Sequence, residues 1–384
     1  MKKTIKLAVV AALALGTTSA FATNGAQLIG TGAKTRGMAG VGIGMSHGAE
    51  SALSNPALIT SVKGTEISFG GTLFMPKVKN TSSMGSAEST ADKNVIPEVS
   101  LATKVNDNFY WGIGMWGTGG MGVDYRDAAS QYKMVTNLQI MQFGVPLAYT
   151  TNGFSVALTP IMQYGSLDMA LNNGVNDYSA GVAQDLQMGY NVGVSYMMAG
   201  LTVGAVYKSQ IDMDYKNVMT EAMKGFGATY PNSKLSTPAE IGGGISYTMD
   251  GSTLAIDYKQ IKWSACKGYK DFGWKDQNVI AIGYEYATDG WAARVGYNYA
   301  KSPIEHQTTS TITGLSAGYV DMLNLLGFPA VVESHATVGG TYNVSKSTSI
   351  DLAYMYVPEK TVTMSGMTVK HSQSGVSAQL NYAF

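Results

Sequence analysis

Apolar and polar residues alternate one by one in many short stretches of this chain. The chain ends on such a stretch, because from Ser374 to Phe384 every second residue is apolar and those between are small or polar. Successive side chains of a β-strand point to opposite faces, so this stretch predicts a strand with one apolar face. A last strand that ends on an aromatic residue is typical of an outer-membrane barrel, where it must pair with the first strand because lipid tolerates no open sheet edge.

The same alternation predicts further strands along most of the chain. They are expected near residues 65–78, 95–105, 109–117, 137–150, 153–166, 185–198, 200–212, 238–249, 251–264, 277–287, 290–301, 332–344, 347–357 and 373–384. This makes about fourteen antiparallel strands, and bacterial barrels have an even number. The predicted fold class is therefore all-β, a transmembrane antiparallel barrel.

The connections between these strands alternate in length. Tight turns such as Asp250-Gly251 and Asp289-Gly290 separate long loops near residues 79–94, 118–136, 167–184, 213–237, 265–276, 302–331 and 358–372. Outer-membrane barrels have short periplasmic turns and long extracellular loops, so the alternation supports the barrel and places both ends of the wall on the periplasmic side.

The start of the chain differs from the rest. Residues 1–22 combine three lysines, a short apolar run and a small-residue cleavage site, which predicts a secretory signal peptide. Residues 23–61 are rich in glycine, which weakens both helix and strand. Irregular backbone at membrane depth must lie inside a barrel, so residues 23–61 are expected to form a hatch, or plug, in the lumen of a barrel spanning residues 62–384. A disordered linker is the alternative.

Composition excludes several classes of function. Only 14% of residues are charged, against about 25% in soluble domains. Removing the three signal lysines from 26 basic residues leaves a slight acidic excess, which does not suit nucleic-acid binding. The single cysteine and four scattered histidines form no metal site, no cofactor motif is present, and His371 and Ser372 would point to opposite sides of a strand. We therefore expect no enzyme; a water-filled diffusion porin and a structural or adhesin barrel remain alternatives to a transporter.

Three segments resemble the FadL-type family of long-chain fatty acid and aromatic hydrocarbon transporters. Asn55-Pro56-Ala57-Leu58-Ile59-Thr60 resembles the end of that family's hatch, and residues 276–303 and 349–356 resemble its late hairpins. The resemblance implies a fourteen-stranded barrel closed by an N-terminal hatch, in the outer membrane of a Gram-negative bacterium. It implies passive uptake of hydrophobic compounds, either long-chain fatty acids or aromatic hydrocarbons such as toluene. The expected partners are such a ligand, outer-membrane lipid or lipopolysaccharide, and the barrel assembly machinery through the Phe384 strand, with the protein a monomer.

Two long loops are unexpectedly apolar. Their main apolar residues are Met219, Met223 and Phe226 in one loop, and Leu323, Leu326 and Phe328 in the other. Exposed apolar loops are costly unless they pack together or bind something. Two interpretations follow: an extracellular groove that captures apolar ligand, or two segments that only cap each other.

Charged residues alternate with the apolar residues of several strands. If the apolar faces meet lipid, then Glu66, Lys208, Glu240, Asp257, Lys259, Glu285, Arg294 and Asp351 point into the lumen. They are expected either to form an ion-pair network that anchors the plug, or to bind a ligand carboxylate through Arg294, Lys208 or Lys259.

A run of glycines interrupts the strand near residues 109–117. Glycine within a strand often marks a bulge or bend, and the FadL-type family has a kinked strand that opens the barrel wall sideways. Gly112 and Gly114 are therefore the predicted site of a wall kink, with a flexible loop starting at Gly117 as the alternative.

Overall fold

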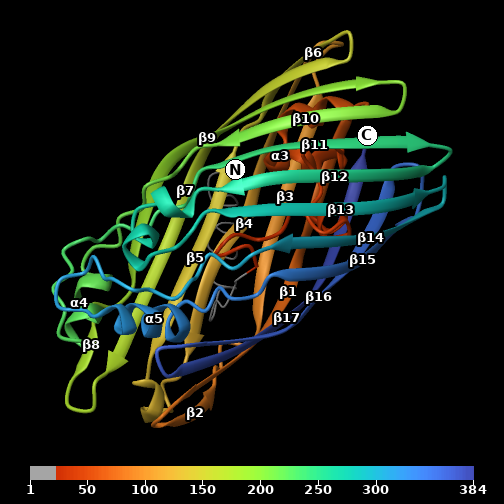
Figure 1. Cartoon of the computed structure of the whole chain (residues 1–384). Coiled ribbons are helices and arrows are strands. Elements are labelled where there is room, and N and C mark those ends of the chain that lie inside the picture. Colours follow the sequence, from red (N-terminus) through yellow and green to blue (C-terminus); the bar gives the residue numbers. More distant parts are fainter. Residues whose placement is uncertain (1–22) are drawn as a thin grey trace, which may run out of the picture.

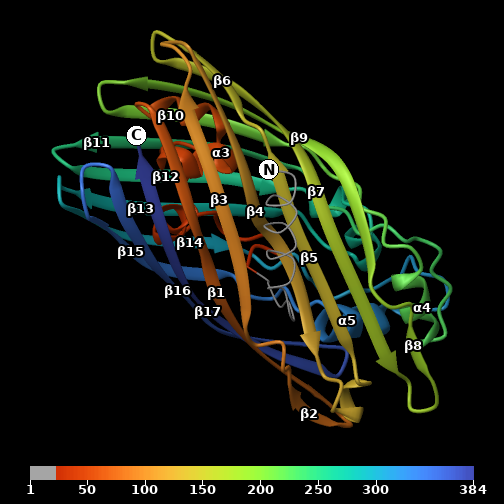
Figure 2. The same cartoon turned by 180° about the vertical axis from the view of Figure 1, so that it is seen from behind.

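In the computed structural model, which describes residues 23–384, one antiparallel sheet curls into a closed barrel around an irregular inner segment (Figures 1 and 2). The predicted signal peptide, residues 1–22, lies outside the described residues. The strands are β1 Thr65–Ser82, β2 Gly85–Glu88, β3 Asn94–Lys104, β4 Phe109–Asp124, β5 Val135–Gly144, β6 Leu147–Thr151, β7 Phe154–Asn172, β8 Asp177–Ser179, β9 Ala183–Met198, β10 Leu201–Lys208, β11 Glu240–Met249, β12 Ser252–Ile261, β13 Gln277–Ala287, β14 Trp291–Ala300, β15 Ser334–Asn343, β16 Thr348–Met364 and β17 Met367–Ala383.

The wall consists of fourteen strands, as the alternation predicts. β5 and β6 are two parts of one wall strand, since both pair with β4 on one side and β7 on the other, while the short β2 and β8 belong to loops. β1 and β17 close the barrel in register from Glu66↔Ala383 to Thr81↔Thr368. The predicted pairing of the last strand with the first is therefore confirmed.

The two faces of the wall carry the predicted side chains. Along β14, Val295, Tyr297 and Tyr299 are exposed on the outside, whereas Arg294 and Asn298 are buried inside. The other charged residues predicted to face the lumen also lie on inner positions. Among the described residues, no helix is long and apolar enough to cross a membrane.

Several strands are longer than predicted. β4 continues to Asp124 and β7 to Asn172, and the predicted loop at residues 358–372 is a hairpin in which β16 and β17 turn at Ser365-Gly366. Polar positions such as Thr361, Thr363 and Thr368 hide the alternation there, because above the membrane neither face needs to be apolar.

The helices are short. The α-helices are α2 Ala33–Gly37, α3 Ser51–Ser54, α4 Val218–Lys224 and α5 Ala317–Leu326, and the 3₁₀ turns are η1 Gly48–Glu50, η2 Pro56–Ser61, η3 Ala129–Gln131, η4 Trp263–Ala265 and η5 Tyr269–Phe272. α4 and α5 gather at the long-loop end of the barrel, opposite the end where β17 terminates (Figure 1).

Residues 23–61, which we call the inner segment, lie within the barrel (Figure 2). Apart from Ser61 at its end, its side chains are mostly buried, and it contacts strands on every side of the lumen, from β1 through β9 to β17. Its backbone is irregular: a glycine-rich bend separates α2 from η1, and η1, α3 and η2 follow one another almost without interruption. The position agrees with irregular backbone being tolerated only where protein surrounds it.

Candidate functional site

One cavity, which we call the main cavity, lies in the lumen between the inner segment and the wall. The space between its lining atoms is about 940 Å³, a value that includes open solvent. Its apolar lining comes from the inner segment (Leu28, Ile29, Ile43, Leu53) and from the wall (Ile161, Val206, Ile211, Val279). About half of its lining residues are polar or charged, so the cavity combines apolar surface with hydrogen-bonding and charged groups, as ligand pockets do.

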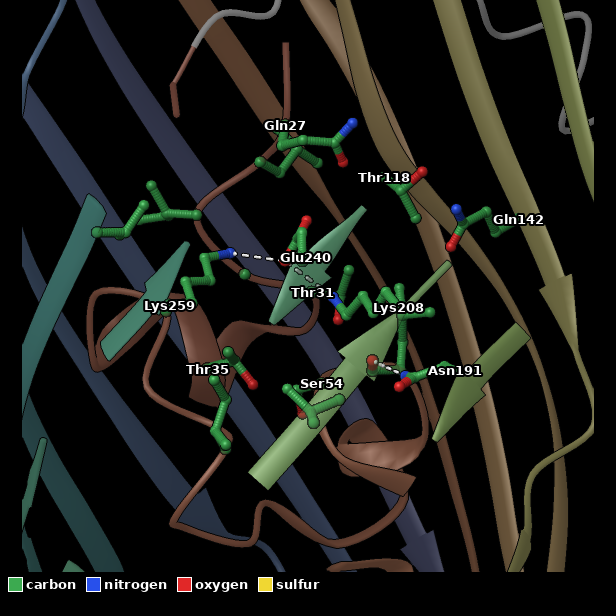
Figure 3. Close-up of a pocket in the computed structure, with 18 of the residues that line it drawn as sticks. Gln27, Thr31, Thr35, Ser54, Thr118, Gln142, Asn191, Lys208, Glu240 and Lys259 are labelled. Carbon is green, nitrogen blue, oxygen red and sulfur yellow. Dashed lines mark hydrogen bonds and ion pairs between the residues drawn. The ribbon is translucent and has the colours of Figure 1, made fainter. Parts of the chain in front are cut away.

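Two of the three predicted carboxylate-binding residues meet in this cavity. Lys208 of β10 and Lys259 of β12 flank Glu240 of β11, with Nζ–Oε2 distances of 3.6 Å and 3.3 Å (Figure 3). The register places Lys208 opposite Glu240 and Lys259 diagonally beside it, all on the inner face. Two lysines share one glutamate, so this cluster, the cationic pole, carries one excess positive charge.

Arg294 lies elsewhere, at the part of the wall under α2. Its guanidinium bonds Glu285 at 2.6 Å and Thr341 at 2.8 Å and lies 3.7 Å from Asp351. It is 6% exposed and does not line the main cavity. Arg294 therefore belongs to an ion-pair network with Glu285 and Asp351. This was one of the two roles predicted for it, the other being to bind a ligand carboxylate.

The middle of the inner segment is held by one carboxylate of the wall. Asp257 of β12 accepts hydrogen bonds from the backbone nitrogens of Gly42, Ile43 and Gly44 at 2.7, 2.7 and 3.1 Å. Asp257 is 3% exposed. Successive backbone N–H groups form an anion-binding concavity. The three N–H groups of the inner segment therefore stabilise the negative charge of Asp257.

Asn55 of the predicted hatch motif ties the end of the inner segment to the wall. Its Nδ2 donates to the carbonyls of Ile43 at 2.9 Å and of Val194 in β9 at 3.1 Å, and its Oδ1 accepts from the nitrogen of Ala57 at 3.1 Å. Pro56 follows at the first position of η2, where its missing N–H costs nothing. The Asn55-Pro56-Ala57 motif thus acts here as a helix cap and a wall contact together.

The wall itself makes room for the inner segment. At eight glycines of the wall strands, an added Cβ would come within 2.9 Å of an atom of this segment: Gly119, Gly193, Gly204, Gly242, Gly244, Gly283, Gly296 and Gly339. The backbone of the inner segment therefore lies directly on the backbone of the wall. These glycines were not predicted to have this role. Asp257 was predicted to anchor the plug through ion pairs, and it holds the segment through backbone amides instead.

β4 leaves its neighbour β3 partway up the wall. The β3–β4 ladder ends at Glu98↔Trp116 although both strands continue, and a bulge follows between Gly117 and Gly119. Beyond it, the inner segment takes over the pairing, since Leu28 N donates to Thr118 O at 3.1 Å and Gly120 N donates to Ala26 O at 3.0 Å. The wall is thus interrupted between β3 and β4, and the start of the inner segment satisfies the exposed edge.

The predicted kink at Gly112 and Gly114 is displaced. Both glycines pair in regular register with Ala102 and Ser100 of β3, and the irregularity begins at Gly117. A Cβ at Gly114 would overlap the ring of Trp116, which is buried and donates to Ser100 Oγ at 2.8 Å. Glycine at position 114 therefore leaves room for the indole ring of Trp116, and the strand does not bend there.

The two apolar loops meet over the mouth of the barrel. Met219 and Met223 of α4 and Leu323 and Leu326 of α5 are buried in one continuous apolar cluster. Phe226 and Phe328 are only partly buried and pack against it. The closed arrangement corresponds to the interpretation in which the loops cap each other, with the aromatic side chains at its outer surface.

The remaining candidates for chemistry are the acidic, histidine and cysteine side chains. No three His, Cys, Asp or Glu residues among residues 23–384 are grouped as metal ligands. Burial raises the pKa of the Cys266 thiol, which keeps it protonated at neutral pH.

A closed fourteen-stranded barrel with an apolar outer belt, an inner segment and a partly apolar cavity in the lumen defines an outer-membrane transport barrel. Residues 12–314 match the family model of outer membrane protein transport proteins (OMPP1/FadL/TodX), and the chain belongs to this family. It is an outer-membrane protein of a Gram-negative bacterium.

The comparisons include both branches of this family. The chain is 26% identical to the long-chain fatty acid transport protein of Escherichia coli O6:H1, over 89% of this chain and 88% of the relative. It is 23% identical to outer membrane protein P1 of Haemophilus influenzae, over 84% of each. Its fold matches the crystal structure of the P. putida toluene transporter TodX with a TM-score of 0.71 at 17% identity, covering 93% of this chain and 99% of TodX.

Proposed function

We propose that this protein takes up hydrophobic compounds passively across the outer membrane, and that it is not an enzyme. The observation that carries the proposal is the partly apolar cavity between the wall and the inner segment. Relatives named for long-chain fatty acid transport and for toluene transport support it. The test is uptake of labelled oleate and labelled toluene by cells with and without the protein; equal uptake of both compounds in the two strains would contradict it.

Capture begins at the mouth in this proposal. Phe226, Phe328 and Tyr319 offer the partly exposed apolar surface of the loop cluster, and Phe226 packs against Tyr319 with ring centroids 6.2 Å apart. Apolar ligand collects on these rings, and separation of α4 from α5 admits it to the lumen. The protein is a monomer in this proposal, and lipopolysaccharide surrounds its wall. The barrel assembly machinery recognises it through the strand that ends at Phe384.

The cationic pole gives fatty acids a contact that hydrocarbons lack. Lys208→Met removes the excess positive charge while Glu240 keeps Lys259 at 3.3 Å. A charge-assisted hydrogen bond is worth ~1.5–3 kcal/mol, so uptake of oleate is expected to fall about tenfold and that of toluene to stay the same. The ratio of oleate uptake to toluene uptake is measured with both labelled compounds supplied to the same cells.

Two variants separate this effect from a structural one. Lys262→Met removes a lysine that pairs with Asp276 outside the cavity and is expected to change neither uptake. Arg294→Met breaks the ion-pair network and is expected to reduce both uptakes equally. Equal loss of oleate and toluene uptake in Lys208→Met would contradict carboxylate binding by the cationic pole.

The ligand leaves sideways in this proposal, through the interruption between β3 and β4. The inner segment acts as the hatch, because the stretch from Ala26 to Leu28 covers the free edge of β4 and must move before the gap opens. Lateral release would deliver an apolar ligand into lipid without passage through the water of the periplasm.

Gly117→Val tests this exit. A Cβ at Gly117 would lie 2.5 Å from Cγ2 of Ile96 in β3, so a valine fills the space between the separating strands. Uptake is expected to fall about tenfold, with heat-modifiable gel mobility as the check that the barrel assembles. Gly243→Val, whose Cβ would meet nothing closer than a carbonyl oxygen at 3.6 Å, is the control. Undiminished uptake by assembled Gly117→Val would place the exit elsewhere.

A further inference from the structure

The main cavity has a second group of polar side chains, distant from the cationic pole along the wall. We call Gln27 of the inner segment, Thr118 of β4 and Gln142 of β5 the neutral pole (Figure 3). The bridge between Gln27 and Gly119 brings the inner segment to Thr118, and the pair Trp116↔Gln142 brings β5 to the same bulge. Between the two poles around the barrel stand β7 and β9.

The side chains of the neutral pole have unused hydrogen-bonding capacity. Gln27 and Thr118 are 6% and 7% exposed, and neither the Nε2 of Gln27 nor the Oγ1 of Thr118 has a partner among the described residues. An unpaired buried polar atom is costly and uncommon in a native protein. Both residues line the cavity, and their unpaired groups are a donor on Gln27 and a donor or acceptor on Thr118.

Gln142 adds an acceptor whose orientation is fixed. Its Nε2 donates to Oε1 of Gln163 at 2.9 Å, and Nε2 of Gln163 donates to Oγ1 of Thr237 at 2.8 Å. This chain of bonds uses one of the two N–H donors of Gln142, fixes which end of the amide is the oxygen, and leaves that oxygen available to the cavity. The neutral pole therefore presents both donors and acceptors but no charge, which suits a hydroxyl or carbonyl group.

We infer that the cavity is built for fatty acids that carry a second oxygen, a hydroxyl or oxo group on the chain. This rests on the proposed function, in which the carboxylate binds at the cationic pole. The chain then crosses the apolar lining past β7 and β9, and the second oxygen replaces water at Gln27, Thr118 and Gln142. An unsubstituted chain leaves these atoms to water or without partners, so a site that bonds a polar group disfavours the ligand lacking it.

The test compares dissociation constants of purified protein for octadecanoate, 10-hydroxyoctadecanoate and 12-hydroxyoctadecanoate, by displacement of labelled oleate. One of the two hydroxy acids is expected to bind roughly fivefold more tightly than octadecanoate, the effect of one net hydrogen bond. In Thr118→Val and Gln27→Leu, the ratio between hydroxy acid and octadecanoate is expected to fall toward one. Partitioning of the acids into detergent affects this ratio equally in every protein, so comparing the ratio between the wild type and the variants removes its effect.

Thr159→Val is the matched control, because Thr159 also carries a buried hydroxyl without a partner in the described structure but does not line the cavity. It is expected to keep the wild-type ratio. Equal affinities of all three acids in the wild type, or an unchanged ratio in both neutral-pole variants, would overturn the inference while octadecanoate binding still supports the proposed function. Absence of octadecanoate binding would overturn the proposed function and the inference with it.

Discussion

Replacing Asp257 with alanine should release the inner segment from the wall while the barrel still assembles. The carboxylate accepts three backbone hydrogen bonds from Gly42, Ile43 and Gly44, and these donors have no other acceptor in the described structure. Hydrogen bonds to a charged group contribute ~1.5–3 kcal/mol each, so docking of the segment should weaken by on the order of 5 kcal/mol. This is a large share of the stability of a typical domain.

Two measurements report the release. Lys34 and Arg36 of the inner segment are trypsin sites that the wall protects, since Arg36 is 4% exposed and bonds Glu98 and Thr72. In Asp257→Ala, trypsin is expected to cut there at least tenfold faster, and single-channel recordings are expected to show larger and more frequent conductance steps.

Asp289→Ala is the control for this experiment. Asp289 lies exposed in the turn between β13 and β14, and within residues 23–384 only its backbone carbonyl takes part in a hydrogen bond, from Asn343. Its removal is expected to change neither cleavage nor conductance. Wild-type trypsin resistance in Asp257→Ala would show that the remaining contacts hold the segment without this carboxylate.

The barrel could be predicted from the sequence because lipid imposes a local rule on it. Every wall strand must show an apolar face, so alternation within a strand such as β14 reveals the strand without knowledge of its neighbours. Above the membrane this rule ends, and the hairpin of β16 and β17 beyond Val357 was predicted as a loop for that reason.

The contacts of the inner segment could not be predicted in the same way. Asp257 and Gly42 are 215 residues apart, and an aspartate on an inner strand face looks the same in sequence whether it meets water, a lysine or three backbone amides. The contacts of the cationic pole could not be predicted from the sequence for the same reason. Charge and alternation place Lys208, Lys259 and Arg294 on the inner face, but only the barrel register shows that Arg294 belongs to a different cluster.

In the two apolar loops, the spacing of apolar residues predicts the helices but not what the helices contact. The apolar spacing near Met219 and Met223 and near Leu323 and Leu326 corresponds to α4 and α5. Whether such faces bind ligand or each other depends on which loops the barrel brings together, and here one closed cluster contains both.

Two adjacent glycines of β11 should respond in opposite ways to the same substitution. Gly244 faces the lumen, where a Cβ would overlap Oδ1 of Asp257 and lie 2.5 Å from the nitrogen of Gly44. Gly243 faces the lipid, with nothing closer to its Cβ than 3.6 Å. Gly244→Ala is therefore expected to expel the inner segment and open the lumen to ions, whereas Gly243→Ala should be neutral or stabilise the strand by ~0.5–1 kcal/mol, because alanine loses less backbone entropy than glycine.

Conductance and heat-modifiable gel mobility of both variants measure the difference. Gly244→Ala is expected to retain the mobility of a folded barrel, since Gly204 and Asp257 on the neighbouring strands keep their ladder partners. Its effect should not add to that of Asp257→Ala, because both remove the same contact and coupled substitutions are not additive. A closed channel in Gly244→Ala, or equal conductance in the two glycine variants, would mean that the inner segment does not depend on this close approach to β11.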